Sequence, residues 1–116
     1  MAITQAVCNS FKVELLQGEH DFRSSGGDAF KLALYTNSAS LDATTTAYGT
    51  GNEVSASGSY AAGGGALTNQ GAAASGATAF IDFADLSFTS ATISAQAAVI
   101  YNSNTSATTN TNAAVM

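Results

Sequence analysis

The chain has few of the residues that carry chemistry. Of its 116 residues, one is cysteine, one is histidine and none is tryptophan or proline; 46% are hydrophobic and only 9% are charged. Because Cys8 is the only cysteine, no intrachain disulfide can form. A nucleophilic Cys8 would need a nearby base, which the single histidine is poorly suited to supply. We therefore expect a buried free thiol that packs as a small apolar group.

Basic residues are also scarce. Lys12, Arg23 and Lys31 stand against eight carboxylates, which gives a net charge of −5. Direct DNA or RNA binding normally needs a cluster of Lys and Arg, and an anionic membrane surface attracts the same residues, so we expect neither partner. No apolar run approaches the ~20 residues of a spanning helix. The N-terminus lacks the basic and apolar regions of a signal peptide, which predicts a protein made in a cytoplasm.

Alternation of apolar and charged residues dominates segment 9–16. Its apolar and charged positions are Phe11, Val13 and Leu15 on one side and Lys12 and Glu14 on the other. A period of two is typical of a half-buried strand. The sequence therefore predicts a strand here, ended by a break at Gln17 and Gly18.

A second alternating segment covers residues 30–35. We expect Phe30, Leu32 and Leu34 to point inward. We expect Lys31 and Tyr35 to point outward. Because both segments alternate cleanly, we expect them to pair as antiparallel strands.

Two further segments are expected to complete the core. Residues 92–101 alternate at first and become apolar on both faces at 98–100, which is typical of a central or covered strand. Residues 80–88 contain three phenylalanines. We expect a short strand or an irregular edge there, whose aromatic rings fill the core.

Small and polar residues fill the remaining segments. Residues 56–79 are rich in Gly and Ala and predict a long loop, an extended arm or weak strands ordered by a partner. Residues 102–112 predict a polar loop, and residues 113–116 begin another strand. An interrupted strand leaves an open sheet edge, so either the chain is a fragment or a neighbouring subunit completes the sheet.

These segments predict one all-β domain over residues 1–116, with residues 1–10 as an N-terminal arm. We expect an antiparallel β-sandwich or small barrel of about six to eight short strands, completed either by C-terminal strands missing here or by a neighbouring subunit. The predicted core residues are Phe11, Val13, Leu15, Phe30, Leu32, Leu34, Phe83, Phe88, Ile93 and Val99.

Three polar or glycine-rich clusters are candidate sites. Residues 19–21, Glu-His-Asp, have the chemistry of a metal or proton site, but neighbouring side chains point apart, and we expect a solvated loop. Asp82 and Asp85 lack a functional partner and are expected to cap turns or guard an edge strand. Residues 63–65 are glycines without the Lys of a phosphate-binding loop. We therefore predict no catalytic residue, cofactor site or metal ligand, and no enzyme.

The four tyrosines allow two interpretations. Tyr35, Tyr48, Tyr60 and Tyr101 suit an interface, because tyrosine is favoured where one end is dry and the other wet. Ordinary tyrosines at the rim of the domain fit equally well.

Several of these segments carry a resemblance to a family. Residues 3–16, 18–22, 30–35, 80–85 and 98–102 resemble a group of small virion proteins of tailed bacteriophages, described as decoration, minor capsid or tail-associated proteins. The resemblance weakens in the Gly/Ala tract and in the polar loop. Similar proteins continue past the equivalent of Met116 into further strands. The group has no known catalytic residues to carry over.

The resemblance implies a structural component of a phage virion, made in the host cytoplasm. We expect a capsid decoration or cement protein that contacts other virion proteins and copies of itself through mostly uncharged β-surfaces. The alternatives are a tail- or fibre-associated virion protein, or a glycan-binding adhesion module. Exposed tyrosines beside Asp or Asn would favour adhesion, a broad flat patch would favour assembly, and a pocket joining His20 to two carboxylates would favour a small enzyme.

Overall fold

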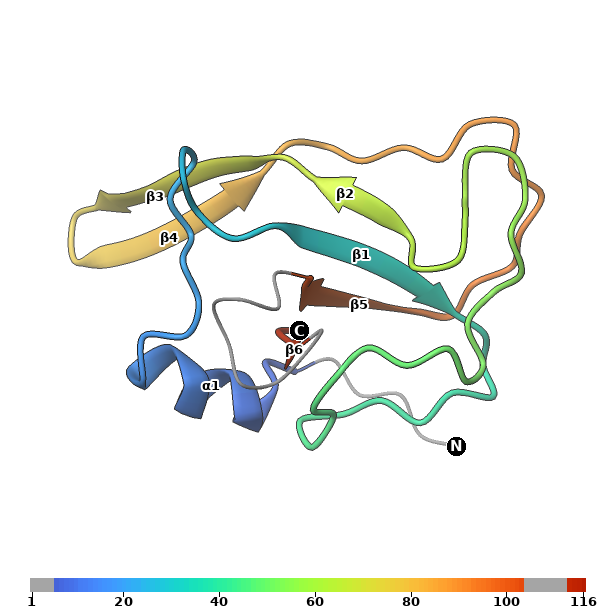
Figure 1. Cartoon of the computed structure of the whole chain (residues 1–116), viewed down its shortest axis with the longest axis horizontal. Helices are drawn as coiled ribbons and strands as arrows, with labels where there is room; N and C mark the ends of the chain where they lie inside the picture. The colour runs from blue at the N-terminus through green and yellow to red at the C-terminus, as the bar shows by residue number, and fades with distance from the viewer. Residues whose placement is uncertain (1–5, 104–112) are drawn as a thin grey trace.

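A computed structural model describes residues 6–103 and 113–116. Within these residues the chain is mostly strands in two antiparallel sheets, with little helix, as an all-β fold requires (Figure 1). The elements, in chain order, are α1 (Asn9–Leu16), β1 (Phe30–Tyr35), β2 (Gly65–Leu67), β3 (Asn69–Ser75), β4 (Thr78–Phe83), β5 (Ala97–Asn102) and β6 (Ala113–Ala114).

The larger sheet has the strand order β2-β1-β5-β6. Strand β1 is central and pairs antiparallel with β5 along its whole length, from Phe30 opposite Asn102 to Tyr35 opposite Ala97. The predicted strand over residues 30–35 is confirmed. The predicted strand over 92–101 is confirmed only for its apolar second half, since 92–96 lie outside any strand. The short strand expected near the end of the chain is β6, which pairs with β5.

The strand predicted over residues 9–16 is wrong, because this segment is helix α1. Phe11 and Glu14 lie three residues apart on one helical face and are both buried, whereas Val13 and Leu15 are 56% and 46% exposed. Good helix formers such as Leu, Lys and Glu fill the segment. In a segment of eight residues, apolar and charged side chains can alternate with a period of two by chance. Here the one aromatic side chain, Phe11, is buried against the core and fixes the segment there as a helix.

The helix ends in a Schellman motif that the strand interpretation missed. Gly18 adopts a positive φ of 75°, its N–H donates to the carbonyl of Leu15 at 3.1 Å, and the N–H of Glu19 donates to that of Glu14 at 3.0 Å. The partners of β1 are therefore β2 and β5 rather than the segment 9–16.

An aromatic cluster joins α1 to both sheets. Phe22 stacks on Phe30 with ring centroids 4.6 Å apart, Phe11 meets Phe22 edge-on at 5.9 Å, and Phe83 meets Phe30 at 5.7 Å. Of the predicted core residues, Phe11, Phe30 and Val99 are buried. Those that are only half-buried are Leu32, Leu34, Phe83, Phe88 and Ile93.

The prediction for Tyr35 is also wrong, because this residue is 3% exposed rather than outward-facing. Both faces of β1 are largely covered, since the residues of this strand are all buried or half-buried. A strand covered on both faces does not obey a simple inward–outward alternation.

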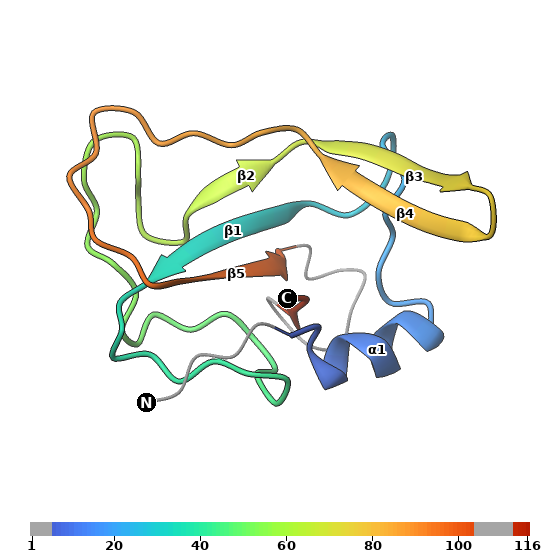
Figure 2. The same cartoon turned by 180° about the vertical axis from the view of Figure 1, so that it is seen from behind.

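The second sheet is the hairpin β3–β4, which projects beyond the end of the larger sheet (Figures 1 and 2). Much of it lies in residues 56–79. Of the three forms expected for that segment, short strands are found, and β4 of the same chain orders them. The register shifts between Asn69 and Ala72, where Gly71 adopts a φ of +90°, as in a β-bulge. Within segment 80–88, Phe83 fills the core as predicted, but Phe80 is 47% exposed.

Two predicted segments fall mainly outside the described residues. Of the predicted N-terminal arm, residues 1–5 lie outside them, residues 6–8 lead into α1, and Asn9 and Ser10 belong to α1 rather than to an arm. Of the predicted polar loop, residues 104–112 lie outside them, and the loop prediction is wrong at Asn102, which is the fully buried last residue of β5.

Candidate functional site

The expectation of a solvated loop around His20 is wrong, because His20 is buried in a polar network. Its Nε2 lies 3.0 Å from Oε1 of Glu14 on α1, and its Nδ1 lies 3.0 Å from Nδ2 of Asn102 on β5. The same Asn102 amide nitrogen donates to Oδ2 of Asp28 at 2.8 Å. The side chain of His20 has no exposed area, and Asn102 is fully buried.

The donors of this network can be assigned from chemistry. A carboxylate only accepts, so the Asn102 atom facing Asp28 is its NH₂ group, whose second hydrogen points to His20. Nδ1 of His20 is then an acceptor, and Nε2–H donates to Glu14. The network ties α1, the segment before β1 and the end of β5 together across the core.

This network joins one imidazole to two carboxylates, which is the arrangement named above as favouring an enzyme. However, the imidazole has no exposed area, so no substrate reaches it in this conformation. The sequence gives no local signal for the network, because Asn102 opens what looks like a polar loop and Asp28 follows two glycines.

The four tyrosines converge on Glu53, and three of them are buried rather than exposed at an interface or a rim; Tyr48 is half-buried, as a rim tyrosine would be. Tyr48 and Tyr60 donate their hydroxyls to the Glu53 carboxylate at 2.6 and 2.7 Å. Tyr101 stacks on Tyr48 with centroids 4.6 Å apart, and Tyr35 donates to the carbonyl of Gly49 at 2.7 Å. Tyr35, Tyr60 and Tyr101 are each at most 3% exposed. Four separate segments are thereby held around one carboxylate.

Burial raises the pKa values of the four tyrosine hydroxyls. Desolvation is the main cause, and the nearby charge of Glu53 adds to it. The pKa of Tyr35 is raised to about 12, and the pKa values of Tyr48, Tyr60 and Tyr101 are raised as well. The four tyrosines and Glu53 therefore form a hydrogen-bonded tyrosine clamp whose hydroxyls stay protonated over the ordinary pH range.

The glycine tract belongs to this clamp and does not form a phosphate cradle. The N–H of Gly63 donates to Glu53 at 2.8 Å, and its carbonyl accepts from Tyr101 at 2.6 Å. Gly64 has a φ of +83°, and a Cβ there would overlap the carbonyl of Leu32. Glycine is therefore required for close backbone approach at this position.

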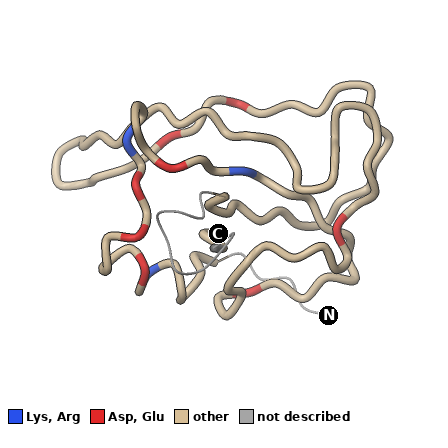
Figure 3. Tube along the Cα trace, in the orientation of Figure 1, with Lys and Arg blue, Asp and Glu red and all other residues tan. Residues whose placement is uncertain are grey.

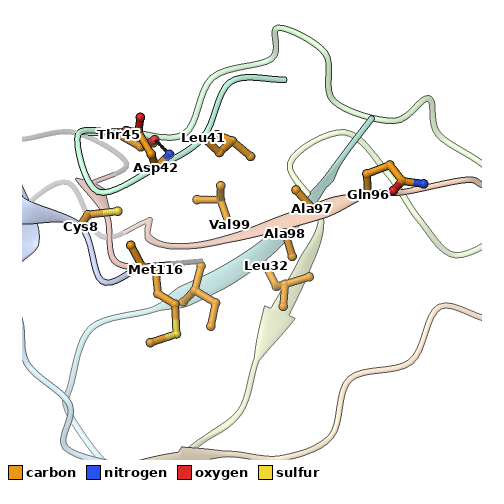
Figure 4. Close-up of a pocket in the computed structure, with 12 residues that line it drawn as sticks. Cys8, Leu32, Leu41, Asp42, Thr45, Gln96, Ala97, Ala98, Val99 and Met116 are labelled. Carbon is orange, nitrogen blue, oxygen red and sulfur yellow. Dashed lines mark hydrogen bonds between the residues drawn. The ribbon is translucent and has the colours of Figure 1, made fainter. Parts of the chain in front are cut away.

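Cys8 is buried, as predicted, with 3% of its surface exposed, and burial raises the pKa of its thiol. It lines a cavity of about 330 Å³ beside β5 (Figure 4). Most of the lining is apolar, including Leu32, Leu41 and Val99, while Asp42 supplies a carboxylate. His20 does not line this cavity. The cavity is therefore an apolar hollow.

The remaining acidic residues contact solvent. Asp82 and Asp85 are exposed, and Asp82 lies on β4, which fits the predicted edge position. Asp21 is paired with Arg23, whose guanidinium lowers the pKa of that carboxyl to about 2. Across the described residues, no group of three or more His, Cys, Asp or Glu side chains is placed to hold a metal ion. None of the helices in that part of the chain is long and apolar enough to cross a membrane.

The projecting hairpin is one of two unburied apolar features of the described chain; the other is α1, where Val13, Leu15 and Leu16 are 56%, 46% and 91% exposed. Nearly every residue of β3 and β4 is exposed or half-exposed, and Phe80 and Ile81 are 47% and 37% exposed. No charged residue or histidine occurs from Val54 to Ile81. Figure 3 shows the hairpin without blue or red, apart from its base near the body.

Family models, curated proteins and solved structures were compared with the chain, and none matched. Within the described chain, the His20 network and the tyrosine clamp use their polar side chains internally, and the hairpin leaves apolar side chains outside.

Proposed function

We propose that this protein is a non-enzymatic structural component of a bacteriophage virion, and that it acts as a capsid decoration or cement protein. The observation that carries the proposal is the hairpin β3–β4, a two-stranded ribbon exposed on both faces whose one charged residue is Asp82, near its base. An isolated two-stranded hairpin is only marginally stable in water, and an exposed apolar surface is typical of a contact site. The sequence resemblance to small virion proteins points to the same role.

Stabilisation of the shell would follow from mass action. A protein that binds the assembled shell but not its precursors lowers the free energy of the assembled state. Contacts made by uncharged side chains and backbone would depend little on salt, because screening acts on charges. The role needs contact area rather than catalytic groups.

The tyrosines favour assembly over glycan binding. A sugar-binding surface of the kind considered above needs exposed tyrosines beside Asp or Asn, whereas three of the four tyrosines here are buried. A place in the tail or fibre, instead of the head, is the alternative within the same structural role.

We further propose that the β-sandwich or barrel expected from the sequence is completed in the particle by a neighbouring subunit. The larger sheet ends at β2 and β6, and the hairpin is a separate two-stranded sheet. The β2 edge and the hairpin offer backbone N–H and C=O groups with which an incoming strand can pair. The β6 edge is partly covered, because the N–H of Ala114 donates to the carbonyl of Thr46 at 3.0 Å.

The test is the location of the protein in particles of the phage that encodes it. Gradient-purified particles are probed with gold-labelled antibody and imaged; we expect regular labelling of the head. A variant in which a short turn replaces residues 70–81 should remain folded by circular dichroism and be missing from particles. Labelling of the tail supports the alternative location, and absence from intact particles would contradict the proposal.

A further inference from the structure

The larger sheet has an incomplete edge along β5. Strand β6 pairs only with the last two residues of β5. The chain after β6 adds a contact with Ile100, whose N–H donates to the carbonyl of Met116 and whose carbonyl accepts from the N–H of Val115, both at 2.8 Å. Residues 97–99 of β5 have no strand on this side among the residues that the structure describes.

The backbone groups of Ala98 point out of this edge. Ala98 lies opposite Leu34 of β1. The N–H of Leu34 donates to the hydroxyl of Tyr60 at 2.8 Å, and its carbonyl accepts from Val54 at 3.0 Å. Opposed residues of an antiparallel pair exchange either both hydrogen bonds or none, so Leu34 and Ala98 exchange none. The N–H and C=O of Ala98 therefore point away from β1, on the same side as those of Ile100 two residues later.

The apolar cavity beside β5 lies at this open edge (Figure 4). Ala97, Ala98 and Val99 from the uncovered part of β5 line it, and so does Met116, which bonds with the next residue of β5. Ala98 is exposed, so the edge is accessible. The cavity holds about 330 Å³, whereas an apolar cavity of about 150 Å³ already takes one benzene molecule. It therefore has room for more than one apolar side chain.

These features favour an extended peptide over other ligands. A donor and an acceptor on one edge residue match the backbone of an added strand, and alternate side chains of such a strand point to one face. A sugar or a nucleotide would leave buried polar groups without partners against this apolar lining. Asp42 is the one charged residue in the described lining, so an acidic strand is disfavoured.

We propose that an extended, uncharged strand from a second protein adds to the sheet at residues 97–99, antiparallel to β5, and places apolar side chains in the cavity. The added strand continues the line of β6 and pairs with the N–H and C=O of Ala98. The inference rests on the structural role proposed above in taking the second protein to be a neighbouring virion subunit. The open edge is short, so isolated strands should bind weakly, and high effective concentration on a particle would strengthen the contact.

A synthetic strand tests the site. The probe is a capped, fluorescently labelled hexapeptide of alternating valine and threonine, titrated with the full chain and followed by anisotropy. We expect a dissociation constant below about 1 mM. The same peptide with proline in place of its middle valine lacks one N–H and should bind at least about tenfold more weakly. Saturating peptide should also slow hydrogen exchange of the Ala98 amide at least about tenfold, as measured by NMR.

Two proline variants locate the contact. Ala98→Pro removes an N–H that points away from β1, and proline is tolerated at such edge positions. It should stay folded by circular dichroism and raise the dissociation constant at least about tenfold. Ala62→Pro is the matched control, because Ala62 is the second residue of a turn closed by the bond from the Gly64 N–H to the Ala61 carbonyl. It should bind the peptide within about twofold of the wild type.

The outcomes separate this inference from the proposed function. If the alternating peptide does not bind, or if it binds without slowing exchange at Ala98, the inference is overturned, while presence of the protein in particles leaves the structural role standing. Binding of 1-octanol without binding of the peptide overturns it too, because the cavity then takes a small molecule. Peptide binding by a protein that is absent from particles supports strand addition at β5 and overturns the structural role.

Discussion

Buried polar side chains hold separate segments of this molecule together through hydrogen bonds that are shielded from water. Asn102 is the clearest case, because one amide group serves the imidazole of His20 and the carboxylate of Asp28 in a fully buried position. A buried polar group without a partner costs more than a hydrogen bond gains, so such a residue is difficult to replace.

We expect Asn102→Ala to lower the free energy of unfolding by about 2–4 kcal/mol, because it leaves two buried acceptors without this donor. Urea unfolding followed by circular dichroism measures the change. Asn37→Ala, at an exposed turn, is the control and should stay within about 0.5 kcal/mol of the wild type. Equal effects of the two variants would show that the network does not stabilise the fold.

At this scale the sequence predicted the surroundings of some residues and missed others. The burial of Cys8 followed from its being the only cysteine in a chain with little other chemistry. The burial of His20 did not follow, because its partners Glu14 and Asn102 are 6 and 82 residues away. The tyrosine clamp was missed for the same reason: its carboxylate, Glu53, has no local pattern that marks it as a centre.

Among the secondary-structure elements, α1 shows how a local pattern is overruled by packing. Phe11 alone among its large apolar side chains is buried, while Leu16 is 91% exposed. A strand would have buried Phe11, Val13 and Leu15 together. The helix instead pairs Phe11 with Glu14, whose partner His20 is brought close by the turn at Gly18.

This difference between helix and strand gives a measurable prediction. Phe11→Ala should cost about 3–5 kcal/mol of the free energy of unfolding, as expected for a buried aromatic ring. Val13→Lys should cost less than about 0.5 kcal/mol, because the side chain is exposed and lysine is a good helix former. Denaturant unfolding measures both, and a large loss from Val13→Lys would support the strand.

Strands with bulky apolar residues were predictable, and those built from small residues were not. β1 and the second half of the predicted strand 92–101, which is β5, followed from runs of large side chains. β3 is mainly Gln, Gly, Ala and Ser, and it is defined by its pairing with β4 rather than by its own residues. This pairing depends on a contact between two strands, which the pattern of apolar and polar residues within one strand does not reveal.

For the whole molecule, the tyrosine clamp couples stability to alkaline pH. Burial raises the pKa of Tyr35 from its ordinary value of 10.0 to about 12, and the other three pKa values are raised too. At a pH below the tyrosine pKa of the unfolded chain, the hydroxyls are protonated in both the folded and the unfolded state, so the tyrosine clamp contributes fully to the free energy of unfolding. As pH rises above it, the unfolded chain loses protons first, and this contribution to stability is lost as pH approaches the folded pKa values.

We therefore expect the free energy of unfolding to fall steeply between about pH 10 and pH 12, by up to about 1.4 kcal/mol per pH unit for each tyrosine. The chain has no tryptophan, so near-ultraviolet phenolate absorbance reports the tyrosines directly. It should rise together with the loss of circular dichroism. Absorbance that rises near pH 10 while the fold persists would show that the hydroxyls are open to solvent.

The enclosed position of Cys8 has a practical consequence. A thiol that is shielded and kept protonated reacts slowly with oxygen and with alkylating reagents, so native copies should not become covalently cross-linked on storage. The rate at which this single sulfur is modified, followed by mass spectrometry, then measures how often the molecule opens.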